Sequence, residues 1–145
     1  MKALIQRVSS ASVTVDNEVV GDIRQGLLVL LGVEPHDTED TVKAACSKLS
    51  RYRVFSDSDG KMNLSVKDIG GSVLLISQFT LAGDTKKGLR PSFSSAAKPD
   101  HANAIYQRLA EQLRLEGVPC DTGIFAADMK VALVNDGPVT FMLEF

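Results

Sequence analysis

Two segments with alternating apolar residues lie on either side of a short polar motif near the C-terminal end of the chain. Every second residue from Met129 to Leu133 is strongly apolar, and so is every second residue from Phe141 to Phe145. Such alternation is typical of strands with one buried face. The motif between them is Asn-Asp-Gly-Pro-Val-Thr, at residues 135–140. Because Asn-Asp-Gly between strands favours a tight turn, the sequence predicts a C-terminal hairpin.

The proline of this motif is unusual in an ordinary hairpin. Pro138 removes one backbone donor and restricts the residue before it, whereas Gly137 tolerates the widest choice of backbone conformation. Two interpretations remain open at this point. In the first, a trans proline closes a tight turn, as most X-Pro bonds in folded proteins are trans. In the second, a rigid loop with a cis Gly-Pro bond presents bare backbone groups to a ligand.

The length and composition are those of one globular domain, residues 1–145. Hydrophobic residues make up 44% and charged residues 23% of the chain. The longest apolar run, residues 27–33, is too short to cross a membrane, and the N-terminal residues lack the apolar stretch of a signal peptide. Cys46 and Cys120 have no CxxC spacing, so neither a disulfide scaffold nor a zinc site is expected. These features fit a reducing, cytoplasmic setting.

The net charge limits the possible partners. A protein that binds duplex nucleic acid over many phosphates is usually strongly basic, whereas this chain carries a formal charge of −2. Any contact with nucleic acid is therefore expected to be local and confined to a short terminal segment of it.

Hydrophobic periodicity predicts an α/β (α+β) fold with mostly β-structure up to residue 33 and two main helices. Val42, Ala45, Cys46 and Leu49 form a stripe at helical spacing, and Gly117 is a plausible helix stop. A turn at residues 56–60 lacks the Glu that would close a calcium loop. The expected elements are a hairpin of residues 11–15 and 19–23, buried strands at residues 27–33 and 72–78, a short strand at residues 52–55, and helices at residues 38–51 and 100–116.

Polar residues follow the second buried strand, where a rigid element could place them in a pocket. They belong to the segment Ser77-Gln78-Phe79-Thr80-Leu81. A Ser or Thr nucleophile needs a base, and the chain contains two histidines, His36 and His101. Neither has neighbours that suggest a triad, so both are expected to be ordinary surface residues. Chemistry at this site would therefore depend on positioning and backbone donors.

A polar loop follows at residues 82–95, with Lys86, Lys87 and Arg90 close together in sequence. Long loops of this kind are often functional in small domains. A solvated loop and a small basic patch for phosphates both remain open.

The polar segment at residues 77–81 and the Asn-Asp-Gly-Pro-Val-Thr motif, in this order, resemble the D-aminoacyl-tRNA deacylases of the D-tyrosyl-tRNA deacylase type. The resemblance extends over the whole chain. It also includes the segments Ile5-Gln6-Arg7-Val8, Ala11-Ser12-Val13, Gly60-Lys61-Met62-Asn63, Arg90-Pro91-Ser92-Phe93 and Phe125-Ala126-Ala127-Asp128-Met129.

The resemblance implies a compact, barrel-like fold that acts as a homodimer. It implies hydrolysis of the ester that joins a D-amino acid, or glycine, to the terminal adenosine of tRNA. This is chiral proofreading in translation, and it needs no metal and no organic cofactor. The 2′-hydroxyl of the RNA and a positioned water would do the chemistry, without a protein nucleophile.

The resemblance also assigns roles to residues. Gly137 and Pro138 would form a cis pair that enters the partner's pocket and rejects L-aminoacyl esters, and Arg7 would hold their loop. The aminoacyl and oxyanion side would be formed by Ser77, Gln78, Phe79 and Thr80. Phe125 and Met129 would contact the adenine.

Two other functions remain open. One is hydrolysis of small esters or amides with Thr80 as a true nucleophile. The other is a non-catalytic, dimeric RNA-binding module, which the weak overall charge disfavours.

Overall fold

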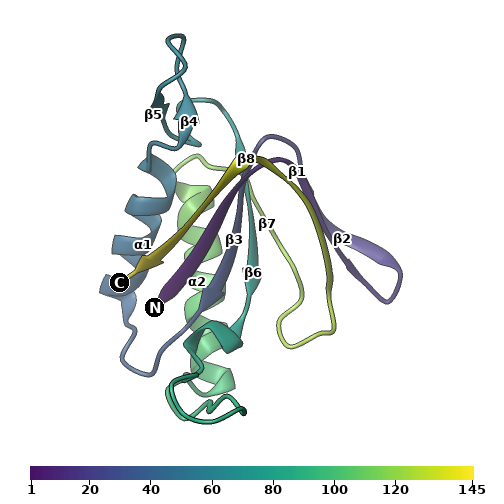
Figure 1. The fold of residues 1–145 in the computed structure, drawn as a ribbon, viewed down its shortest axis with the longest axis vertical. Coiled ribbons are helices and arrows are strands. Elements are labelled where there is room, and N and C mark those ends of the chain that lie inside the picture. Colours follow the sequence, from purple (N-terminus) through teal and green to yellow (C-terminus); the bar gives the residue numbers. More distant parts are fainter.

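The computed structural model describes residues 1–145 and has a mixed α+β fold, in which a nearly closed, barrel-like sheet carries two helices on one face (Figure 1). Neither helix is long and apolar enough to cross a membrane. The elements in chain order are β1 (Lys2–Val15), β2 (Glu18–Ile23), β3 (Gly26–Gly32), α1 (Glu39–Arg51), β4 (Phe55–Ser56), β5 (Met62–Leu64), β6 (Ser72–Ser77), the short 3-10 helix η1 (Phe79–Ala82), α2 (Pro99–Leu115), β7 (Cys120–Thr122) and β8 (Lys130–Glu144).

The main sheet has the strand order β2-β1-β3-β6-β7, and β8 pairs with β1. Strand β1 is antiparallel to β2, β3 and β8, whereas β3, β6 and β7 run parallel to one another. A bond from the Asp22 N–H to the Asp121 carboxylate (2.9 Å) links β2 to β7. The two ends of this strand order therefore lie close together, as expected for a barrel-like sheet.

Strands β3 and β6 are buried on both faces. Leu28, Leu74 and Ile76 belong to an apolar cluster inside the curved sheet, whereas Leu27 and Leu75 belong to a larger cluster that includes the helices. Successive side chains of a strand point to opposite faces, so both sets must be apolar. The predicted buried strands at residues 27–33 and 72–78 are therefore confirmed, although β6 ends at Ser77.

Both helix predictions are confirmed to within one residue at each end. All four residues of the stripe that includes Val42 and Leu49 are buried in α1. The Thr41 hydroxyl accepts a hydrogen bond from the Thr38 N–H (3.0 Å) and so caps the first turn. In α2 the buried Tyr106 hydroxyl donates to the Leu75 carbonyl (3.0 Å), which fixes this helix against β6.

The predicted C-terminal hairpin is wrong. Residues 130–144 form one long strand, β8, and both of its halves pair with β1 rather than with each other. The register passes from Gln6↔Thr140 to Val8↔Asn135, so residues 136–139 bulge out of the sheet. A strand of 14 residues offers enough length for both halves, and this long-range pairing replaces the local turn.

One smaller prediction changes in detail, whereas the predicted turn at residues 56–60 is confirmed. The strand expected at residues 52–55 is reduced to β4, which pairs with β5. The turn between them is closed by Asp57, whose Oδ1 accepts the N–H groups of Lys61 (3.0 Å) and Asp59 (2.9 Å). These bonds hold the pKa of the Asp57 carboxyl below its usual value.

The two chain ends meet beside the turn that follows β3. The α-ammonium of Met1 lies 2.8 Å from Asp37 Oδ1, also bonds to the Glu34 carboxylate, and is 3.2 Å from the Phe145 carbonyl. His101 is half-buried and its Nε2 lies 2.9 Å from the Asp37 carbonyl. The expectation of a surface histidine is therefore wrong for His101, because α2 packs against this turn.

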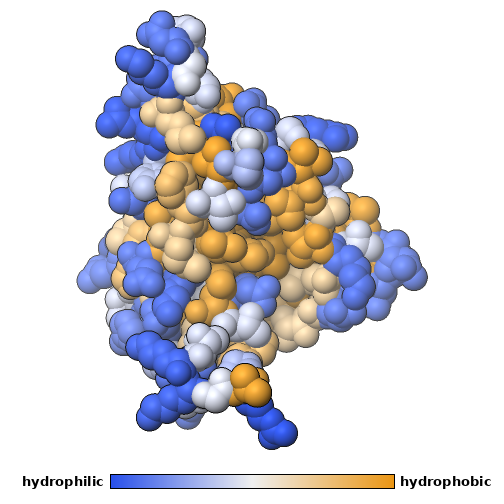
Figure 2. Space-filling model, viewed as in Figure 1, coloured by the Kyte–Doolittle hydropathy of each residue, from blue (hydrophilic) through white to orange (hydrophobic).

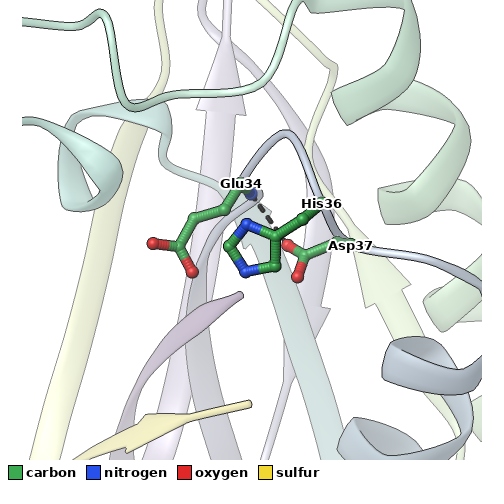
Figure 3. A group of neighbouring side chains, drawn as sticks. All are labelled: Glu34, His36 and Asp37. Carbon is green, nitrogen blue, oxygen red and sulfur yellow. Dashed lines mark hydrogen bonds between the residues drawn. The ribbon is translucent and has the colours of Figure 1, made fainter.

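Glu34, His36 and Asp37 come close enough to suggest a metal site (Figure 3), since one donor atom from each lies within 4.8 Å of the others. However, both carboxylates are already bonded to the Met1 α-ammonium, and Asp37 Oδ2 also accepts the Glu34 N–H (2.7 Å). His36 is exposed, as predicted. The cluster is thus explained as a counter-charge for the chain end.

The substitution Asp37→Asn is expected to destabilise the protein strongly, because it leaves a buried ammonium without its full counter-charge. The side chains of Met1 and Asp37 are both 0% exposed, and breaking a buried pair costs roughly 3 to 5 kcal/mol. Urea unfolding would measure the loss. Asp40→Asn, on the exposed first turn of α1, is the matched control and should lower the free energy of unfolding by at most about 1 kcal/mol, through the lost interaction with the helix dipole. Equal stability of the two variants would contradict the role of the pair.

Candidate active site

A cavity of about 520 Å³ opens beyond the carboxyl end of β6. It lies between this strand, the start of α2 and the segment that leads into β8. Ligands of open parallel sheets commonly bind outside the carboxyl ends of the strands. The lining residues are Ile76, Ser77, Gln78, Phe79, Phe93, Ala96, Ala97, Pro99, Ala102, Phe125, Ala126, Ala127, Met129 and Val131.

Three of the five residues of the polar segment predicted from the sequence line this cavity. Ser77, the last residue of β6, and Gln78 line the cavity, and the Gln78 N–H bonds to the Leu31 carbonyl of β3 (2.8 Å). Thr80 is exposed in η1 and does not line the cavity. Its Oγ1 accepts a hydrogen bond from Gln78 Nε2 (2.6 Å), which fixes both side chains relative to each other.

Two phenylalanines form one wall of the cavity. The rings of Phe79 and Phe93 are 5.1 Å apart between centroids and are tilted by 59°. They are 54% and 41% exposed, which is unusual for such large apolar side chains and leaves ring surface free for a ligand. Sequence analysis gave Phe93 no individual role, because the loop that brings it to Phe79 has no periodic pattern.

The opposite wall comes from the segment before β8. Phe125 is half-buried and its ring lies 6.1 Å from that of Tyr106, which anchors it to α2. Met129 packs closely on Gly123. Ala126, between them in sequence, has a φ of +64°, a conformation uncommon for a residue with a side chain. No local signal in the sequence indicates this turn.

The cavity lining contains no ionisable side chain. Neither histidine lines it, and burial raises the pKa of the Cys120 thiol to about 12 and that of Cys46 to about 11. Both thiols are therefore protonated and unreactive near neutral pH. The prediction of a site without a catalytic triad is consistent with this geometry.

A second group of predicted residues lies where β8 bulges. Arg7 donates from Nε to the Asp136 carbonyl (2.8 Å) and from Nη1 to the Val54 carbonyl (2.7 Å). It thereby connects the bulge to the segment before β4. The Gly137–Pro138 peptide bond is cis, and Gly137 has a φ of +147°. Both residues are exposed.

Asn135 closes this bulge, and sequence analysis missed its role. Its Oδ1 accepts the Val139 N–H (2.7 Å) and its Nδ2 donates to Thr140 Oγ1 (2.9 Å). These bonds join the two ends of the bulge, so residues 136–138 are held from both sides. The sequence signal for this role was the residue type, because Asn side chains commonly form hydrogen bonds with nearby backbone groups.

The two groups of predicted site residues remain separate within one chain. Five of them, namely Ser77, Gln78, Phe79, Phe125 and Met129, line the cavity. Arg7, Gly137 and Pro138 do not line it. One chain therefore has a cavity without the glycine–proline loop.

Comparison with known proteins identifies the family. The family model described as D-Tyr-tRNA(Tyr) deacylase matches residues 4–144. The chain belongs to the D-aminoacyl-tRNA deacylase family. The deacylase of Shewanella amazonensis is 60% identical and that of Salmonella enteritidis 59% identical, each over 99% of both chains.

Solved structures agree with the deacylase fold. A structure named c-Myc DNA Unwinding Element Binding Protein is 41% identical, with a TM-score of 0.95, and the match covers 100% of this chain and 99% of the other. A probable eukaryotic D-amino acid tRNA deacylase is 17% identical, with a TM-score of 0.86 and coverage of 98% and 97%, and shows similarity of fold alone. The family acts on aminoacyl-tRNA and hydrolyses an ester bond.

Replacing Asn135 by Ala in this deacylase is expected to lower the free energy of unfolding by roughly 1 to 3 kcal/mol, because the Val139 N–H loses its acceptor in a largely buried position. Denaturant unfolding measures this loss. Asn135→Asp keeps that acceptor and should recover most of the stability. If Asp were as destabilising as Ala, the bond to the Val139 N–H would not be the cause.

Proposed function

We propose that the protein removes D-amino acids, and glycine, from tRNA by RNA-assisted hydrolysis in the cavity at the end of β6. The observation that carries this proposal is a cavity with aromatic and aliphatic walls, polar groups at one end and no ionisable side chain. Such a cavity suits the flat, apolar faces of an adenine and of an amino-acid side chain. It provides neither a base nor a metal ligand from its walls.

In the proposed reaction, a water oxygen forms a bond to the ester carbonyl carbon and the bond to the ribose oxygen breaks. The ribose oxygen leaves with a proton, and the products are a free amino acid and tRNA. The neighbouring 2′-hydroxyl of the RNA orients the water. The backbone N–H groups of Phe79 and Thr80 stabilise the oxyanion, and Ser77 and Gln78 position the ester.

The adenine is proposed to lie between the two walls of the cavity. Phe125 and Met129 provide an apolar surface on one side, and ring stacking is the usual way in which proteins hold an unpaired RNA base. The exposed faces of Phe79 and Phe93 suit the rest of the aminoacyl end. Positioning by these walls would contribute most of the rate, since a reactive ester needs little more than alignment.

The loop of Gly137 and Pro138 is proposed to act as the chirality filter in the cavity of a second copy of the chain. Two observations support this. The loop is exposed and does not line its own cavity, and Asn135 and Arg7 hold its backbone from both sides. A rigid backbone can reject an L side chain sterically, whereas glycine has no side chain to reject.

The homodimer that this filter requires is supported by the surface around the loop. Val134 and Met142 of β8 are 57% and 47% exposed. Figure 2 shows hydrophobic residues gathered over the middle of this face of the molecule. Apolar surface of this kind is common where subunits associate. We propose that this face contacts the second copy and that the enzyme works in the cytoplasm, where tRNA is charged.

Three alternatives have less support. A nucleophilic Thr80 would need a base, yet its hydroxyl contacts the Gln78 amide and no histidine lines the cavity. Duplex DNA binding, suggested by the name of one similar structure, fits poorly with a net charge of −2. A purely RNA-binding module would bind tRNA without releasing any amino acid.

The proposed activity is tested by comparing tyrosine release from D-Tyr-tRNA and L-Tyr-tRNA without added metal, first for the wild type and then for Thr80→Ala. We expect release from the D-form alone, and Thr80→Ala should retain activity to within about tenfold, because hydroxyl positioning contributes modestly. If Thr80 were a true nucleophile, Thr80→Ala would lower kcat roughly 10⁶-fold.

A tRNA that ends in 2′-deoxyadenosine should be hydrolysed far more slowly than the natural one. Rapid hydrolysis of this substrate would exclude RNA assistance.

Gly137→Ala is expected to reduce the ratio of D- to L-Tyr-tRNA hydrolysis. A Cβ at this position would lie 2.7 Å from Val139 Cγ2 and 2.9 Å from the Val139 nitrogen, so the loop must shift. Gly60→Ala is the matched control, because Gly60 also has a positive φ (+77°) but has open space around it. An unchanged ratio in a folded Gly137→Ala protein would count against the filter.

A further inference from the structure

The loop between η1 and α2 projects beyond the cavity as a closed unit. The N–H and carbonyl groups of Asp84 and Ser92 bond to each other in both directions (2.7 and 2.9 Å). The Asp84 carboxylate also accepts the Lys86 N–H (2.9 Å). Residues 85–91 therefore extend from a fixed base, and Figure 1 shows this part of the chain at the lower end of the molecule.

The loop concentrates positive charge that the fold does not use. Residues 84–98 contain four basic side chains and one acidic side chain, although the chain as a whole is acidic. Lys86, Lys87 and Arg90 are exposed, and none has a carboxylate oxygen within the 4.0 Å of an ion pair. In contrast, Lys67 and Arg108 on the body of the protein are paired with glutamates.

The base of the loop is part of the cavity wall. Phe79 precedes the closed segment of residues 84–92, Phe93 follows this segment, and both phenylalanines line the cavity. Ser92 is the neighbour of Phe93, and residues 85–91 are at most four residues from Asp84 or Ser92. Four residues of extended chain cover at most about 14 Å, so the backbone of the three cations lies within roughly this distance of the base of the loop. That spacing fits the nucleotides next to a bound terminal adenosine.

We propose that Lys86, Lys87 and Arg90 bind the sugar-phosphate backbone at the end of the acceptor stem. This inference rests on the proposed function, because that function places the terminal adenosine in the cavity. The cavity lining carries no charge and therefore cannot attract phosphates. The loop supplies this attraction beside the site, while the acidic remainder of the protein limits contact with the rest of the tRNA.

The test uses two charge-matched triple variants of the full chain. The loop variant is Lys86→Gln, Lys87→Gln and Arg90→Gln. The control is Arg24→Gln, Lys43→Gln and Lys61→Gln, which removes two exposed lysines and one exposed arginine elsewhere. The first readout is binding of a 5′-labelled acceptor-stem hairpin RNA with a single-stranded 3′ end, measured by fluorescence anisotropy at 50 to 200 mM KCl.

Three phosphate contacts should weaken wild-type binding by roughly 20- to 40-fold over this salt range. The loop variant should bind about tenfold more weakly at 50 mM KCl, and its slope of log affinity against log salt should be smaller by about 2 to 3. The control should bind like the wild type. Equal weakening in both variants, or none in the loop variant, would overturn the proposal.

The second readout separates this proposal from the proposed function. For each protein, kcat/KM is measured on D-Tyr-tRNA and on the D-tyrosyl ester of adenosine, which has no phosphate. The ratio of the two values should fall about tenfold in the loop variant alone. An unchanged ratio would refute the phosphate contacts while deacylation stands. If the wild type hydrolyses neither substrate, deacylation fails, and the RNA-binding measurement still decides whether the loop binds the stem.

Discussion

Strand β1 pairs with β8 along most of its length, and a shift in their register between Gln6 and Val8 pushes residues 136–139 out of the sheet. The same shift places Arg7 beside the displaced segment, where it bonds to the Asp136 carbonyl. The position of this loop therefore follows from sheet pairing and not from a free-standing turn. A slip of one residue would reverse the inward and outward faces of β8, and Val139 and Leu143, which are buried, would become exposed.

The sequence predicted correctly those features that depend on local periodicity. The stripe from Val42 to Leu49 specifies one buried helix face, and the continuous apolar run at residues 27–33 requires cover on both sides of a strand. The segment at residues 77–81 was placed at a pocket because polar residues directly follow a buried strand. Four of these five residues were proposed for the site, and three of them line the cavity.

Other features were out of reach because they depend on contacts between distant segments. The hairpin prediction used only residues 129–145 and could not include competition from β1. His101 was expected at the surface, yet packing of α2 brings it to the Asp37 carbonyl, 64 residues away. Phe93 joins Phe79 through an aperiodic loop. The sequence also gave no sign that the site residues named by the family resemblance form two separate groups in one chain, one at the cavity and one at the bulge of β8.

The distribution of polar groups suggests how a small acidic protein can select a large anionic substrate. Inside the cavity, recognition depends on shape, backbone groups and the neutral polar side chains of Ser77 and Gln78, because no lining side chain can ionise. If the bulge of a second copy acts as the filter, its precision depends on residues that never touch the substrate, such as Asn135 and Arg7. A filter made of backbone cannot change rotamer to admit the wrong enantiomer, whereas a side chain can. Shape selection in the cavity and charge on the neighbouring loop would then be independent properties.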